Sequence, residues 1–310
     1  MQLPQFHEGE LAVQKRAGED AIAQRNGGAI QNKIVGGALT FIRQQPMVVL
    51  ATEDAEERLW TSILFGKPGF LQPSSDAKQL AIAVPTSTRS AMDLLWSNIE
   101  FNPRIGALIV ELSTRRRLRV NGDAVLDKSE LTIHVQESYP LCPKYIQKRT
   151  VRLEGEPASE LGTDIAEALS LGEDQIDTVK RSDTFFVSST HRTRGPDASH
   201  RGGFSGFVQV VGTNTLRIPD YPGNSMFNTF GNLLINPRAG LIFPDFQRRV
   251  LLQLSGSAEV LWDQPDTEEE TGGSKRLWLF HSERWIESAM PSGVVSELLE
   301  YSPFNPSVAK

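Results

Sequence analysis

The sequence predicts a mainly β protein: two tandem β-barrels that form a pseudo-dimer, with some helices and an additional N-terminal helix. First, the chain repeats itself. Residues 98–106 (NIEFNPRIG) return as 232–240 (NLLINPRAG), and residues 118–122 return as 252–256, both at an offset of 134. Solenoid units are only about 20 to 50 residues long, so this offset indicates two copies of a whole domain. Second, short β-branched segments alternate with Gly, Pro, Asp and Ser clusters, which is typical of hairpins.

The composition supports this organisation. The chain has 310 residues, of which 39% are hydrophobic, and this is enough for two cores. The net charge of −6 argues against a general nucleic-acid surface, which would be basic. We interpret the local cluster Arg115, Arg116, Arg117 and Arg119 as a solvated strand end. A lone cysteine, no signal pattern and no long apolar run predict a cytoplasmic protein without membrane or nucleic-acid partners.

The elements follow in order from the N-terminus. Residues 8–27 are rich in helix formers, and we expect a helix that lies across a sheet. A second helix is predicted over 34–45 because Pro46 marks its end. Four parts are predicted: an N-terminal helical segment (1–36), a first barrel (37–157), a helical linker (158–183, helical over 158–179), and a second barrel with a C-terminal tail (184–310).

Each copy contains a similar series of strands. In the first copy they are predicted at 47–52, 60–65, 80–84, 105–112, 118–126 and 131–137, with a helical turn at 94–102. In the second copy they are predicted at 184–189, 206–211, 216–218, 239–243, 250–254 and 258–262, and the tail 274–286 adds one or two more. Antiparallel hairpins with few helices favour small barrels.

Two segments of the second copy are candidates for binding a cofactor. The first combines a hydroxyl, an imidazole, a guanidinium and a Gly-Gly turn, as a phosphate site requires. It consists of Ser199, His200, Arg201, Gly202 and Gly203. The alternative is a surface ion pair between Arg201 and Asp197, with His200 capping a turn; such exposed pairs contribute only about 0 to 1 kcal/mol.

The first copy lacks this set of side chains. Aligning Ser62 with Ser199 puts Ile63 and Leu64 opposite the histidine and arginine of the second copy. Packing alone gives no reason for a polar set in one copy only. The asymmetry therefore predicts one cofactor per chain.

The second segment follows at Asp220. Tyr221 can lie along a flat ring, Gly223 lets backbone amides face a ligand, and Asn224 offers a donor and an acceptor. A Pro-Gly turn before an Asn-capped helix would also explain this sequence. The two interpretations are compatible, since a helix N-terminus is itself an anion site.

These residues resemble the FMN-binding split barrel of the pyridoxamine 5′-phosphate oxidase family. Each copy has a helix ending in N-P-x-x-G and then a strand closing with G-x-A, at residues 119–124 and 253–258. The likeness spans about 37–262, and segments 142–147, 197–203 and 220–224 resemble the tandem branch of that family. The resemblance implies two split barrels with FMN held between them.

The resemblance also implies further site residues. Gln253 lies on a strand that faces the flavin in that family, and Arg119 holds the matching place in the first copy. Cys142, Lys144 and Tyr145 follow the last strand of the first copy, where they would close the pocket from the opposite side. Alternatively, Cys142 and Tyr145 are packed and Lys144 is solvated.

The function expected from these residues is an FMN-dependent oxidoreductase acting on an unknown small substrate or electron donor. No catalytic residue is identified. The scattered histidines have no metal-ligand spacing, so no metal site is expected, and there is no dinucleotide or Walker motif. Two alternative functions stay open: a barrel that binds haem or another flat ligand, and a non-catalytic interaction module with a separate reductase partner. Assembly as a homodimer also stays open.

Overall fold

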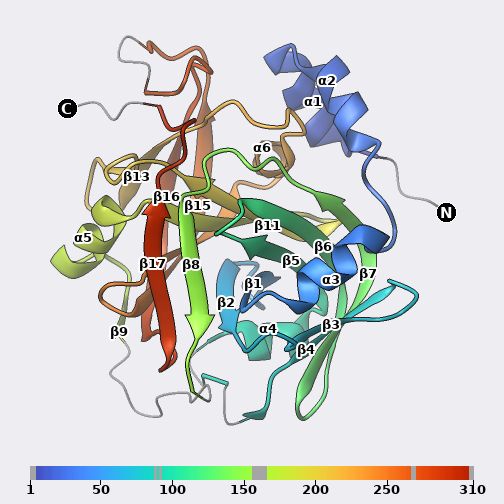
Figure 1. The fold of residues 1–310 in the computed structure, drawn as a ribbon. Coiled ribbons are helices and arrows are strands. Elements are labelled where there is room, and N and C mark those ends of the chain that lie inside the picture. The colour runs from blue at the N-terminus through green and yellow to red at the C-terminus, as the bar shows by residue number, and fades with distance from the viewer. Residues whose placement is uncertain (1–4, 87–88, 91–92, 156–165, 267–269, 307–310) are drawn as a thin grey trace.

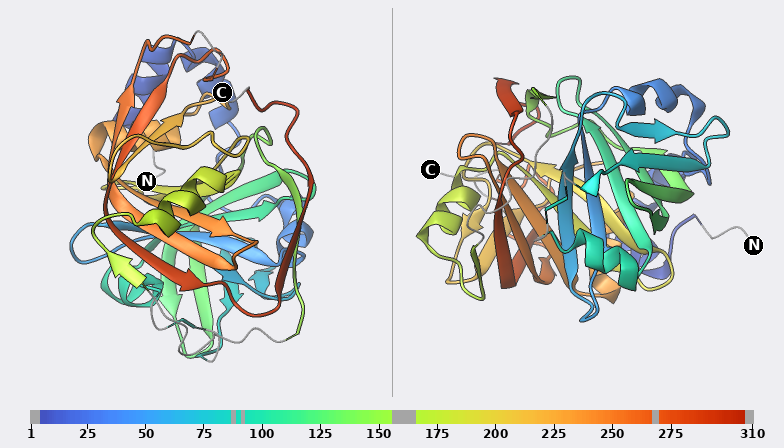
Figure 2. Two further views of the ribbon diagram at one scale, coloured as in Figure 1. Left: turned by 90° about the vertical axis from the view of Figure 1, so that its left-hand side faces the viewer. Right: turned by 90° about the horizontal axis from the view of Figure 1, so that it is seen from below.

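The computed structural model describes residues 5–86, 89–90, 93–155, 166–266 and 270–306, and these form two large antiparallel sheets and a third sheet of two strands. The strand order of the first is β2-β1-β5-β6-β7-β4-β3, and that of the second is β11-β10-β14-β15-β16-β13-β12, with β9 paired to β16. The second sheet thus repeats the first strand for strand. Seen from below, the two halves lie on opposite sides of the molecule (Figure 2). The predicted fold, two tandem split barrels, is confirmed.

The bounds of the elements agree with most of the predicted ones. The first sheet contains β1 (Met47–Glu53), β2 (Leu59–Phe65), β3 (Leu71–Pro73), β4 (Gln79–Ala83), β5 (Arg104–Glu111), β6 (Arg116–Leu126) and β7 (Glu130–Pro140). The second contains β9 (Ala166–Ala168), β10 (Thr184–His191), β11 (Gly195–Gly202), β12 (Gln209–Val210), β13 (Thr215–Pro219), β14 (Arg238–Asp245), β15 (Val250–Leu261) and β16 (Leu277–Ala289). The helices that flank the sheets are α3 (Leu39–Arg43), preceded by the 3₁₀ turn η1 (Gly36–Ala38), α4 (Leu95–Phe101), α5 (Glu173–Arg181) and α6 (Asn228–Ile235).

The repeated N-P-x-x-G motif has a physical cause at the contact between the barrels. A Cβ atom on Gly106 would lie 2.3 Å from the carbonyl oxygen of Pro196 in the other barrel. A Cβ atom on Gly240 would lie 2.4 Å from the carbonyl oxygen of Leu59, again in the other barrel. Backbone meets backbone at both points, so each copy needs a residue without a side chain there.

The described residues form four apolar cores, the smallest of which packs Phe6 and Ala23 against Tyr139 and Met226. Of the three larger cores, one lies within each barrel, and the third lies between them. The third core is built from strands of both copies, with Val49 and Ile63 from the first and Phe186 and Ile242 from the second. Because burying a side chain of this kind contributes roughly 1.5 to 3 kcal/mol, this core fixes the two barrels against each other.

A two-stranded ribbon also joins the copies. β8 (Lys148–Leu153) follows the last barrel strand of the first copy, and β17 (Val294–Glu300) follows that of the second. They pair antiparallel with each other and lie side by side in Figure 1. Neither strand was predicted, because each finds its partner in the other copy rather than in a local hairpin.

The N-terminal segment differs from the expected single helix across a sheet. It forms two helices, α1 (Glu8–Ala17) and α2 (Asp20–Gly27), because Gly18 adopts a left-handed φ of 69° and ends α1. α1 packs on α6 (Figure 1), where a Cβ atom on Gly9 would lie 2.2 Å from the carbonyl oxygen of Gly231. We call α1 and α2 the N-terminal hairpin.

The segment predicted as a helix over 158–179 is helical only in its last part. Residues 158–165 lie outside the described residues, 166–168 form β9, and α5 begins at Glu173. β9 pairs antiparallel with residues 285–287 of β16. That pairing overrides the helix-forming residues of this stretch. In the part of the chain that the structure describes, no helix is long and apolar enough to cross a membrane.

Candidate functional site

A cleft lies at the junction of the two barrels, and both of them line it. It encloses about 870 Å³, counting the part that opens to solvent. The first barrel contributes residues of β6 and the segment after β7; the second contributes the end of β11, residues 219–230 and Arg276. All but one of the residues predicted to bind a cofactor line this cleft: Ser199, His200, Arg201, Gly202, Tyr221, Gly223, Asn224, Cys142, Lys144 and Tyr145.

The segment with the histidine and arginine is a strand rather than a surface loop. β11 pairs with β10 along its whole length, and His200 is opposite Phe186. In the first sheet Ile63 is opposite Val49. Since β10 and β1 hold the same place in their sheets, the register puts His200 and Ile63 in equivalent positions, as the sequence alignment predicts.

Three side-chain nitrogens of His200 and Arg201 lack hydrogen-bond partners. His200 is only 2% exposed. Both of its ring nitrogens and Nε of Arg201 are buried without a hydrogen-bond partner among the described residues. Burial, with the nearby charges of Arg117 and Arg201, holds the pKa of His200 well below its usual value, so the ring is neutral at pH 7. Each unsatisfied buried group costs about 1 to 3 kcal/mol, which a ligand with suitable polar atoms would recover.

The alternative surface ion pair between Arg201 and Asp197 does not form. Asp197 is instead bonded to Arg119, at 3.2 Å, and to Asn121, at 2.6 Å. Arg201 donates from Nη1 to the carbonyl oxygen of His200, at 3.1 Å. The guanidinium of Arg201 therefore faces the cleft without a carboxylate bonded to it.

Two further arginines reach the cleft from β6, where the sequence analysis placed a solvated strand end. Arg119 is 1% exposed and donates to the Tyr139 hydroxyl at 2.8 Å, to the carbonyl oxygen of Ala198 at 3.0 Å and to Ser199 Oγ. For Arg117, burial and then repulsion by Arg201 and Arg119 lower the pKa to about 10. Side chains alternate between the two faces of a strand, and Leu118 and Val120 belong to the first barrel's core. The spacing could therefore have indicated that Arg117 and Arg119 share the opposite face.

The charge of the cleft is positive. Five basic side chains line it: Arg117, Arg119, Lys144, Arg201 and Arg276. Among the described lining residues Asp220 supplies the single carboxylate, and it accepts from Arg276 Nε at 2.8 Å. This excess of cations favours a ligand that carries negative charge.

Aromatic rings form another wall. The ring of Tyr145, from the first barrel, lies 4.9 Å from that of Tyr221, from the second, with a tilt of 44°. The Tyr145 hydroxyl donates to the carbonyl oxygen of Pro222 at 2.9 Å. The segment after β7 therefore reaches across to the second barrel, as expected for a pocket closed from the opposite side.

The N-terminal hairpin holds the loop at the mouth of the cleft. Three of its side chains bond to residues 224–226: Gln14 Nε2 to the carbonyl oxygen of Met226 at 2.9 Å, Asn26 Nδ2 to that of Asn224 at 2.7 Å, and Glu19 to the hydroxyl of Ser225 at 2.6 Å. In this loop Ser225 and Phe227 have left-handed φ values of 63° and 56°. Such conformations cost about 1 to 3 kcal/mol each, so the hairpin stabilises a strained loop.

Gln253 is the one predicted residue that does not reach the cleft. Its side chain donates to the carbonyl oxygen of Thr61 at 2.9 Å and to Ser62 Oγ at 3.4 Å, between the barrels. Arg119 makes the equivalent contacts in the other direction, to Ala198 and Ser199. The sequence correctly matched Gln253 with Arg119, but it is Arg119 that lines the cleft.

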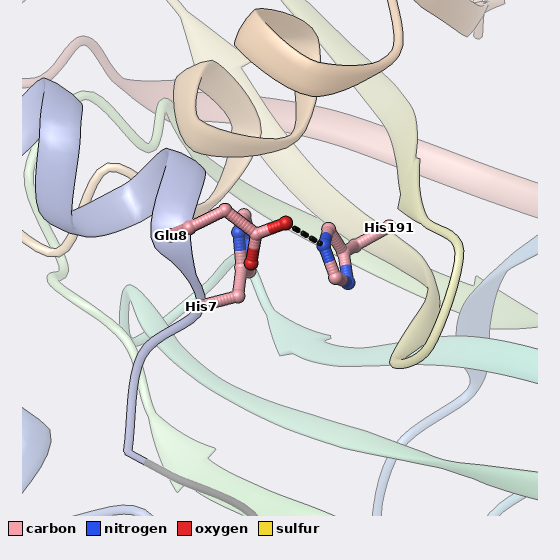
Figure 3. Close-up of side chains that lie close together, drawn as sticks. All are labelled: His7, Glu8 and His191. Atoms are coloured by element: carbon pink, nitrogen blue, oxygen red, sulfur yellow. Dashed lines mark hydrogen bonds and ion pairs between the residues drawn. The ribbon is translucent and has the colours of Figure 1, made fainter.

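A second polar cluster lies beneath the N-terminal hairpin (Figure 3). Here the fold brings together His7, Glu8 and His191, which the sequence spacing did not indicate. The imidazoles stack with centroids 4.1 Å apart and planes 16° apart, so their in-plane lone pairs run side by side rather than toward one point. Moreover, His7 is bonded through both ring nitrogens, to Gly9 N and to Asn232 Oδ1. These contacts assign the cluster to anchoring α1.

Comparisons with known proteins give matches among solved structures alone. No protein-family model and no curated protein matches the chain. A protein from Clostridium acetobutylicum related to general stress protein 26, of the pyridoxinephosphate oxidase family, aligns at 15% identity and a TM-score of 0.29, over 41% of this chain and 92% of its own. The haem storage protein HutZ from Vibrio cholerae aligns at 14% and 0.28, over 38% and 96%. An FAD-binding protein from Mesorhizobium loti aligns at 11% and 0.28, over 40% and 99%.

Proposed function

We propose that this protein binds one FMN per chain in the cleft between its barrels and acts as an oxidoreductase on a small substrate. One observation carries the proposal: both ring nitrogens of His200 and Nε of Arg201 lack partners in a cleft whose described lining residues include five basic side chains and a single carboxylate. A phosphate ester would supply the missing acceptors and charge. The split-barrel fold and the aromatic wall support a ligand that also carries a flat ring.

The residues divide by chemistry into two groups. Arg117, Ser199 and Arg201 would hold the phosphate, since guanidinium and hydroxyl groups donate to phosphate oxygens. Tyr145 and Tyr221 would lie against the ring system. Bound FMN would supply the two-electron chemistry, and the chain would contribute orientation and electrostatics.

We assign no general base among the described lining residues, since burial holds the pKa of His200 well below its usual value. Burial raises the pKa of Tyr145 to about 12 and also raises that of Tyr221. The carboxylate of Asp220 is bonded to Arg276. We therefore place the chemistry on the cofactor ring and assign the chain's residues to binding and orientation.

Binding of haem is a second candidate, because of the state of His200. A neutral imidazole with unpartnered nitrogens is a suitable axial ligand for haem iron. The absorbance spectrum of the purified protein, alone and after addition of each ligand, distinguishes the two: flavin bands support the proposal and a Soret band supports haem. A protein that takes up neither would be the interaction module.

The decisive test is the affinity for FMN of Arg201→Ala. A charge-assisted hydrogen bond contributes roughly 1.5 to 3 kcal/mol, so the dissociation constant should rise by about 10- to 150-fold. Leu64→Ala is the matched control, because Leu64 holds the equivalent position in the first copy, and it should leave FMN affinity unchanged. Equal affinity of Arg201→Ala and the unmodified protein would refute the proposed site.

A further inference from the structure

The cleft has an equivalent place in the other half of the molecule. Strand positions and register match Ser62 with Ser199 and Gln253 with Arg119. The repeat likewise matches α4 with α6, since both helices precede the N-P-x-x-G glycine by the same number of residues. We call the region around Ser62, Gln253 and the start of α4 the mirror site.

A side chain of the protein itself fills the polar part of the mirror site. The Asp93 carboxylate accepts from Ser62 Oγ at 2.6 Å and from Leu95 N, in the first turn of α4, at 3.1 Å. Gln253 donates to the same hydroxyl, Ser62 Oγ, at 3.4 Å. An internal carboxylate is thus bound by a hydroxyl and by the backbone amide at the start of α4.

The cleft presents the equivalent donors without such a carboxylate. At the place of Asp93 the second copy has Phe227, which cannot accept a hydrogen bond. The first turn of α6 (Asn228, Thr229 and Phe230) lines the cleft, and no side chain of the described residues caps it. His200, with its unpartnered nitrogens, lines the same cleft.

We propose that Asp93 is a built-in substitute for an anionic ligand: its carboxylate occupies the mirror site, so the chain takes one external anion, bound near Ser199, Arg119 and the start of α6. The two halves then differ in the origin of the anion. One half supplies it from its own side chain, and the other must acquire it from solution. The identity of the ligand as FMN rests on the proposed function, whereas the occupation of the mirror site does not.

Chemical rescue tests the occupied mirror site. Asp93→Ala removes the carboxylate and leaves its donors unpaired, so the melting temperature should fall. Formate should restore much of this loss, with saturation, whereas chloride at equal ionic strength should not. If the variant needs formate to fold, the yield of folded protein with formate against chloride provides the same readout. Absence of any rescue would overturn the proposal.

The matched control is Asp76→Ala. Asp76 also accepts from a serine hydroxyl, Ser74 Oγ at 2.6 Å, and from a backbone amide, Lys78 N at 3.1 Å. These bonds are exposed, so their loss opens no enclosed site. Formate should not rescue this variant. Equal rescue of both variants would show a general salt effect and overturn the proposal.

Stoichiometry provides the second test. Titration of the unmodified protein with FMN, followed by fluorescence, should saturate at one FMN per chain. Two per chain would overturn the occupied mirror site. Rescue of Asp93→Ala by formate without any binding of FMN would support the occupied mirror site and refute the proposed function, so the two failures are distinguishable.

Discussion

The two barrels have the same strand order and the same backbone contacts, yet they present different chemistry at equivalent positions. Ile63 and Leu64 stand in one half where His200 and Arg201 stand in the other. Ile63 joins the core between the barrels, and Leu64 packs against the first barrel's core. His200 and Arg201 instead line a cationic cleft. The comparison teaches that equivalent positions of a duplicated fold can diverge, so that one copy packs apolar side chains where the other presents polar ones to a cleft lined by both.

The largest expected effect comes from making the halves alike at Arg119. Arg119→Gln introduces the residue found at the equivalent position 253. It should cost roughly 3 to 5 kcal/mol in unfolding free energy, because Asp197 loses a buried ionic partner. Urea unfolding measures this cost. Asp197→Asn in the same background should recover part of it, whereas Gln253→Ala should cost only about 1 to 3 kcal/mol. Equal costs of the two single changes would contradict the asymmetry.

A second effect should follow pH at the N-terminal hairpin, where Glu10 of α1 accepts a hydrogen bond from Asn228 of α6 in the second copy. Burial raises the pKa of Glu10 from 4.5 to about 7, against hydrogen bonds from His7 N and Asn228. The folded state therefore binds this proton more tightly than the unfolded state. Its contribution is complete below pH 4.5 and is lost as the pH rises to about 7, by up to roughly 3 kcal/mol.

Glu10→Gln should remove this loss, which urea unfolding across that pH range would detect. His7 acts in the opposite sense: burial and His191 lower its pKa from 6.5 to about 4, so its contribution is present above pH 6.5 and lost as the pH falls through 4. Since Glu10→Gln leaves the His7 effect in place, the variant should lose stability only on the acidic side. An unchanged pH profile would show that Glu10 is not the responsible group.

Glycine substitutions test whether the barrels are equivalent where they touch. Gly106→Ala and Gly240→Ala each force a methyl group against a backbone carbonyl of the other barrel. Overpacking typically costs about 1 to 3 kcal/mol, and the two costs should be similar. Gly37→Ala is the control, since a Cβ atom there meets nothing within 4 Å. A large difference between the two interface variants would mean that the pseudo-symmetry is only approximate.

The smallest effect concerns ligand affinity. Gln14→Ala removes one bond from the N-terminal hairpin to the cleft loop without touching the cleft. At about 0.5 to 1.5 kcal/mol for a hydrogen bond, FMN should bind roughly two- to tenfold more weakly. The neighbouring Lys15→Ala serves as control, because Lys15 is exposed. Isothermal titration of both variants decides whether the hairpin positions the loop.

The sequence predicted the fold because its signals are local. Hairpin strands and a constant offset need no knowledge of the partner copy, and the register confirms the match of Ser62 with Ser199. β8 and β17 were missed because they pair across the copies. The polar composition of β11, with Gly195 and Pro196 at its start, likewise concealed a strand whose partner, β10, supplies the regular bonding.

The site was predicted where side chains cluster in sequence and missed where the fold brings them together. Ten of the predicted residues share one cleft, because three short segments carry them. Arg117 and Arg119 were assigned to a solvated strand end because the sequence shows only a run of charge. It does not show the second barrel, against which Arg119 is buried and both side chains line the cleft. Asp93 was missed because the side chain that donates to it, Ser62, is 31 residues away in sequence.

The pairing of β8 with β17 has a consequence for biosynthesis. The two strands are separated by about 140 residues, and β17 lies close to the C-terminal end of the described chain. During translation the edge of β8 must therefore remain unpaired until β17 has left the ribosome, and exposed edges of this kind attract foreign strands. Nascent chains that end before Val294 should accordingly recruit chaperones and aggregate more readily than chains that include β17, which pulldown of stalled ribosome complexes can measure.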